Sequence, residues 1–89
     1  MRLLSQDGCI NVPFDKSIIS QETDGDEMHL ICARMIGDLQ TIVLATYPHE
    51  YQATFAMKML NLKYNTASDG LTTYHFPSET EIKRMMGKA

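Results

Sequence analysis

The chain contains 89 residues, of which 44% are apolar and 21% charged, an ordinary balance for one small globular domain spanning residues 1–89. Its formal net charge of −3 gives no long-range attraction to a polyanion, so the composition disfavours nucleic acid and anionic membrane surfaces as partners. No apolar run approaches the ~20 residues that a membrane-spanning helix requires.

The first strands are predicted by a turn signal. Asp7-Gly8 lies between the short apolar runs 2–5 and 9–12, and Asp-Gly in that setting favours a tight β-hairpin. Pro13 has no N–H for a sheet ladder, so it ends the second strand or marks that strand as an edge.

Three further strands are expected before the first helix. Residues 16–21, 28–34 and 40–47 are the extended segments, and the polar, acidic segment 22–27 reads as a turn between the first two. In the last of these strands both faces are partly apolar. Short connections favour an antiparallel meander, so these strands and the hairpin predict one curled antiparallel sheet of four to five strands.

A long helix is predicted from Pro48 to Tyr64. Proline fits the first helical turn, where its missing N–H costs nothing, and Glu50 places a negative charge near the positive end of the helix dipole. At 100° per residue the helix carries two apolar stripes on nearly opposite faces. The first stripe is Ala53, Ala56, Met57, Leu60 and Tyr64, and the second is Tyr51, Phe55, Met59 and Leu62.

The second stripe requires a cover besides the sheet. Leaving such side chains in water forgoes about 1.5 to 3 kcal/mol of burial free energy for each large one. Two coverings stay open: the terminal helix, through Ile82, Met85 and Met86, or a second copy of the chain. We therefore expect this stripe to be an interaction surface, and the chain to be a homodimer or to bind another protein.

The end of the chain is predicted to add a strand and a short helix. Residues 65–70 have loop composition and 71–76 form a candidate strand. Ser78-Glu-Thr-Glu81 is a capping box, and Gly87 provides the stop. The expected fold class is α+β, with the antiparallel sheet packed against one long helix and followed by a short C-terminal helix.

The residues that could carry chemistry are scattered. The histidines and cysteines lack metal-binding spacing, the acidic segment 22–27 has too few ligands for a calcium loop, and the glycines are isolated, so no phosphate cradle forms. A thiol enzyme would need one of the cysteines to meet a histidine in space. We predict no catalytic residue, metal or cofactor, and no identifiable small-molecule substrate. The histidines and cysteines are His29, His49, His75, Cys9 and Cys32.

The cysteines also bear on the compartment. Arg2, Gln6 and Asp7 interrupt the opening segment, which therefore does not read as a secretory signal. We expect a cytoplasmic protein with free thiols, a disulfide between neighbouring strands being the less favoured alternative.

Two segments resemble a known group of proteins. Residues 1–15 read MRLLSQDGCINVPFD, and residues 42–62 contain Leu-Ala-Thr-Tyr followed by Phe-Ala-Met-Lys-Met-Leu. They resemble small uncharacterised proteins of Gram-positive bacteria and their phages or mobile elements, which open with an S-Q-D/N-G hairpin and carry an A-M-x-M-L helix. Pro48 and His49 stand where that group has Ser-x-Glu. The resemblance implies a fold and a genomic setting but no catalytic residues.

The sequence thus favours a non-enzymatic interaction or assembly module, whose partner on the long helix is either a second copy of the chain or a host or phage protein. The alternative is a nucleic-acid-associated accessory protein of a phage or mobile element. It depends on that genomic setting and on the basic cluster Lys83, Arg84 and Lys88, which is also what the last turn of a helix favours against its own dipole.

Overall fold

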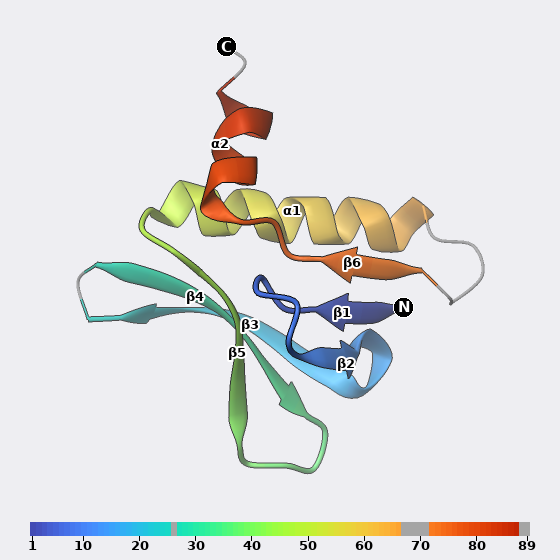
Figure 1. Ribbon diagram of the computed structural model, residues 1–89. Coiled ribbons are helices and arrows are strands. Elements are labelled where there is room, and N and C mark those ends of the chain that lie inside the picture. The colour runs from blue at the N-terminus through green and yellow to red at the C-terminus, as the bar shows by residue number, and fades with distance from the viewer. Residues whose placement is uncertain (26, 67–71, 88–89) are drawn as a thin grey trace.

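The computed structural model describes residues 1–25, 27–66 and 72–87. Five strands come before the long helix, and a sixth strand and a short helix follow it, with a 3₁₀ turn, η1, after the first hairpin (Figure 1). In chain order the elements are β1 (Arg2–Leu4), β2 (Asn11–Pro13), η1 (Phe14–Lys16), β3 (Ser17–Asp24), β4 (Met28–Met35), β5 (Thr41–Tyr47), α1 (Glu50–Thr66), β6 (Thr73–His75) and α2 (Glu79–Met86).

The described strands form two three-stranded sheets, ordered β2-β1-β6 and β3-β4-β5. The predicted single sheet of four to five strands is therefore wrong, while the α+β class, the long helix and the short terminal helix are confirmed. The sheets separate because Pro13 and η1 turn the chain away after β2. β6 then returns to pair with β1 in parallel, an arrangement that a meander lacks.

Local signals predicted several elements with small errors. The hairpin of β1 and β2 is confirmed, and Gly8 adopts the positive φ of 79° that its tight turn requires. β3 extends to Asp24, so half of the predicted turn 22–27 belongs to a strand. α1 runs from Glu50 to Thr66, two residues later at each end than predicted. Of the predicted loop 65–70, residues 67–70 lie outside the described residues, as does Leu71 of the predicted strand.

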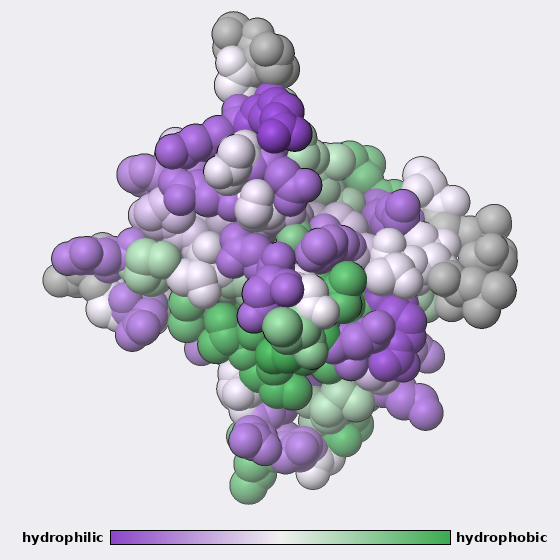
Figure 2. Space-filling model, viewed as in Figure 1, coloured by the Kyte–Doolittle hydropathy of each residue, from purple (hydrophilic) through white to green (hydrophobic). Residues whose placement is uncertain are grey.

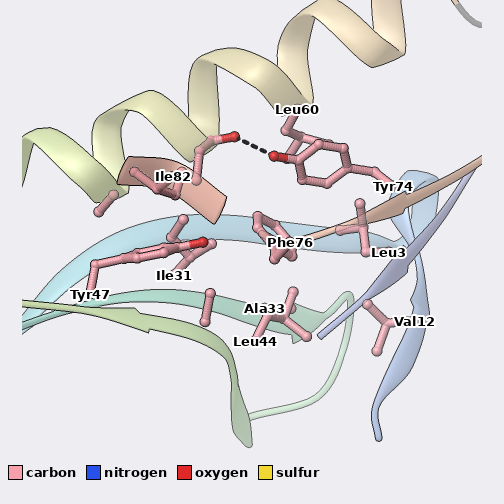
Figure 3. Close-up of a cluster of buried hydrophobic side chains, with 13 residues drawn as sticks. Leu3, Val12, Ile31, Ala33, Leu44, Tyr47, Leu60, Tyr74, Phe76 and Ile82 are labelled. Atoms are coloured by element: carbon pink, nitrogen blue, oxygen red, sulfur yellow. Dashed lines mark hydrogen bonds between the residues drawn. The ribbon is translucent and has the colours of Figure 1, made fainter. Parts of the chain in front are cut away.

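The core lies where the two sheets and both helices meet (Figure 3). Tyr74 of β6 packs edge-on against Phe76 and donates its hydroxyl to the Ala56 carbonyl oxygen of α1 at 2.9 Å. Burial raises the pKa of the Tyr74 phenol well above its ordinary value, so the hydroxyl keeps its proton for this bond. The core side chains are Leu3, Val12, Ile31, Ala33, Leu44, Ala45, Tyr47, Ala53, Ala56, Leu60, Tyr74, Phe76 and Ile82.

A bulge in β5 turns two consecutive side chains inward. Ile31 pairs with Ala45 and Cys32 with Val43, which leaves Leu44 opposite no residue of β4. Leu44 and Ala45 are both 2% exposed. The bulge thus adds a large side chain to the core from a position that strict alternation assigns to the other face.

Gln6 joins the two sheets. It follows β1, and its backbone N–H donates to the Leu44 carbonyl oxygen at 2.7 Å on the free edge of β5. The Gln6 side-chain oxygen accepts from the Thr46 N–H at 3.1 Å, and its amide nitrogen donates at 3.2 Å to the carbonyl oxygens of Thr46 and Pro77. One side chain therefore binds β5 as a neighbouring strand would.

Pro77 holds the start of α2 at the same place. Its carbonyl oxygen also accepts from the Tyr47 hydroxyl at 2.6 Å. The predicted capping box follows at once, with Ser78 and Glu81 exchanging side-chain to backbone hydrogen bonds. The bond from the Ser78 N–H is also the main cause that lowers the pKa of Glu81. α2 is thus held by hydrogen bonds at its first turn as well as by the packing of its apolar side chains.

Gln6→Met tests this junction, because methionine keeps the length of the side chain but cannot hydrogen-bond to Thr46 or Pro77. We expect the free energy of unfolding to fall by about 1 to 3 kcal/mol, since the Thr46 N–H loses its partner. Gln40→Met at an exposed position is the matched control and should change stability by less than about 0.5 kcal/mol. Urea unfolding measures both, and equal effects would contradict the role given to Gln6.

Gln52 on the buried face of α1 gives a second test. Its side chain is fully buried, and neither its oxygen nor its nitrogen finds a hydrogen-bond partner in the described structure. Desolvating an unpaired amide costs about 1 to 3 kcal/mol. Gln52→Met should therefore raise the free energy of unfolding in the same urea experiment, and a loss of stability would show that the amide is paired in solution.

Candidate interaction surfaces

The predicted outward stripe of α1 divides into an exposed pair and a partly buried pair. Tyr51 is 56% exposed and Leu62 is 57% exposed, whereas Phe55 and Met59 pack partly against the core. At 100° per residue, Phe55 and Met59 lie closer to the buried side of the helix than Tyr51 and Leu62 do. The buried face of α1, which includes Gln52, therefore extends towards Phe55 and Met59, and the outward surface is a strip along one flank.

The inward stripe differs from its prediction as well. Ala53, Ala56 and Leu60 are buried, but Tyr64 is 52% exposed, and its ring contacts that of Phe14 from η1 in a tilted arrangement with the centroids 4.9 Å apart. Gln52 takes a buried position on this face. A polar residue there gives no signal in an apolar periodicity, so the sequence interpretation missed it.

The terminal helix supplies part of the cover expected for the outward stripe. α2 crosses the first half of α1, with Ile82 fully buried and Met86 packed against the core (Figure 1). Met85 stays 44% exposed. Of the two coverings considered, the terminal helix is thus present, and it leaves Tyr51 and Leu62 open.

Two shallow hollows lie along the stripe. The first, of about 340 Å³, is bordered by Tyr51, Phe55 and Met86, with Glu50 and Lys58 of opposite charge at its rim. The second, of about 660 Å³, lies between the second half of α1 and β6. Its lining is Met59, Leu62, Lys63, Thr66, Thr73, Tyr74 and His75. All four stripe residues thus border a hollow.

A second apolar surface was not predicted as a site. It involves β3, β5 and the connection between β4 and β5, where Ile18 is 48%, Ile36 69%, Leu39 91% and Val43 44% exposed. Figure 2 shows apolar side chains gathered where β3, β4 and β5 overlap in this view, and again at the tip of the β4–β5 connection. The sequence feature that could have predicted this surface is the presence of apolar residues on both faces of the strand 40–47.

The groups that could carry chemistry are engaged in local structure. Asp7 accepts hydrogen bonds from the Ser5 hydroxyl at 2.6 Å and from the Cys9 N–H at 2.9 Å, and both bonds lower its pKa. Cys9 is exposed and Cys32 buried, and both are free. His49 stacks on Tyr51 at 5.3 Å. The hydrogen bonds among Ser5, Asp7 and Cys9 therefore stabilise the turn of the β1–β2 hairpin.

The described part of the chain holds neither a group of metal ligands nor a membrane-spanning helix. Within residues 1–25, 27–66 and 72–87, no three His, Cys, Asp or Glu side chains are grouped so as to hold a metal ion. No helix in these same ranges has the length and apolar character needed to cross a bilayer. Comparison with protein-family models, with curated proteins and with solved structures gives no match. The apolar surfaces are therefore the features on which a function can be argued.

Proposed function

We propose that this chain is a non-enzymatic interaction module that docks a protein partner on the outward strip of α1. The observation that carries the proposal is the exposure of Tyr51 and Leu62 beside partly buried Phe55 and Met59. Aromatic and large aliphatic side chains set next to hollows are typical of the centre of protein interfaces. The hollows on either side of this strip offer places for a partner's side chains.

The charges around the strip suit a protein better than a nucleic acid. Glu50 and Lys58 border the first hollow with opposite charges, and Lys63 borders the second, so charges of both signs surround the apolar centre as in a protein interface. The alternative of nucleic-acid binding has less support, because Lys83 is paired with Glu79 at 3.2 Å and the chain carries a net charge of −3.

A photoreactive amino acid placed at Leu62 tests the proposal in cells that naturally contain the chain. We expect one discrete crosslinked protein, because Leu62 is an exposed member of the strip and borders the second hollow. Asn61 is the matched control, since it is an exposed neighbour on a different flank of α1 and should give no product.

The crosslink should also disappear when Tyr51→Asp is added to the Leu62 probe, while circular dichroism shows an unchanged fold. The same crosslinks from Asn61 and Leu62, or none from either position, would contradict the proposal.

A further inference from the structure

The face of the β3-β4-β5 sheet opposite the core carries a regular pattern of side chains. Cross-strand pairing sets Ile18, Arg34 and Thr41 in one row, Ser20, Cys32 and Val43 in the next, and Glu22, Leu30 and Thr46 in the third. The core side chains Ile31 and Ala33 occupy the alternate positions of β4 and point the other way. Neither helix covers this outer face.

The outer face is more apolar than an uncovered antiparallel sheet requires. Such a sheet usually buries one face and presents polar residues on the other. Here Ile18 and Val43 are 48% and 44% exposed, and Leu39, which borders the same face, is 91% exposed. Large exposed apolar patches mark contact surfaces, so a cover for this face is expected.

Charge is distributed unevenly over the same face. Arg34 lies at one end and Glu22 at the other, with Cys32 between them on the central strand. Glu22 accepts a hydrogen bond from Ser20 at 2.7 Å, whereas Arg34 forms no ion pair with any residue of the described structure. Burial is the main cause that raises the pKa of the Cys32 thiol, and the negative charge of Glu22 is the second. The effect of Glu22 agrees with the two side chains lying on the same face of the sheet. The face therefore has a positive charge at the Arg34 end, a negative charge at the Glu22 end and an apolar centre between them.

We propose that a second copy of this chain covers the outer face, the two copies being related by a two-fold axis that lies between the sheets and crosses the strands near Cys32. That rotation reverses the strand direction, so the Arg34 end of each sheet meets the Glu22 end of its partner. A two-fold axis along the strands would instead bring Arg34 against its own counterpart. Charge complementarity thus selects one of the two simple face-to-face arrangements.

The apolar groups complement each other in the selected arrangement. Ile36 and Leu39 follow β4 at the Arg34 end, while Met28 and Leu30 are partly exposed near the Glu22 end. Because the strands of the two copies run in opposite directions, Ile36 and Leu39 of one copy lie over Met28 and Leu30 of the other. A hollow of about 350 Å³ beside Leu39 gives room for interdigitating side chains. This proposal uses no residue of α1, so it stands or falls separately from the proposed function.

Sedimentation equilibrium of charge-reversal variants tests the proposal. The wild-type chain should sediment as a dimer, and Arg34→Glu or Glu22→Arg alone should weaken dimerisation by at least about tenfold, because each sets like charges together twice in a symmetric interface. An equimolar mixture of the two single variants should regain the dimer mass, as should the doubly substituted chain. Arg84→Glu, an exposed reversal on α2, is the control and should leave the mass unchanged.

Restoration in the mixture separates a second copy from any other occupant, and it also excludes misfolding of the single variants. A wild-type monomer, or single variants that dimerise as well as the wild type, would overturn the proposal. A mass lowered by Tyr51→Asp with Leu62→Asp, but not by the charge reversals, would also overturn it and would place self-association on α1. Failure of the charge reversals leaves the crosslinking result at Leu62 untouched, so the two proposals are distinguished.

Discussion

The fold depends on how one glutamine attaches a small sheet to a larger one. The β2-β1-β6 sheet has short strands, and Gln6 docks it on the free edge of β5 through its backbone N–H and both ends of its side chain. Pro77 receives bonds from both Gln6 and Tyr47. We call this contact of Gln6 and Pro77 with β5 the seam between the two sheets. Because the polar groups of the seam form hydrogen bonds, it can lie next to the core without the cost of burying unpaired groups.

This junction determines which surfaces are left open. With the small sheet against β5 and α2 started at Ser78, the inner face of the large sheet is covered by α1, β6 and Ile82. The outer face of β3, β4 and β5 and the strip of α1 around Leu62 lie outside that arrangement. The chain thus has one packed core and two exposed apolar surfaces. The strip of α1 is bordered by charges of both signs, whereas the outer face of the sheet has a positive charge at one end and a negative charge at the other.

Sequence reasoning was accurate where a structure depends on neighbours in the chain. The Asp7-Gly8 turn and the Ser78 capping box are local, and both were predicted. The pairing of Leu3 with Tyr74 joins the two ends of the domain, so no periodicity could show it. Phe55 packs partly against the core and borders the same hollow as Met86 of α2, and Leu39 lies in a connection with no alternation at all. Tertiary contacts determine these features.

Native-state hydrogen exchange of individual amides tests most directly whether the seam belongs to a single cooperative unit. The Thr46 N–H, bonded to the Gln6 side chain, and the Gln6 N–H, bonded to Leu44, should exchange as slowly as amides in the middle of β4. Equal protection would mean that the two sheets open only when the whole domain unfolds. Fast exchange at Gln6 and Thr46 while β4 stays protected would contradict the account, because the small sheet would then detach on its own.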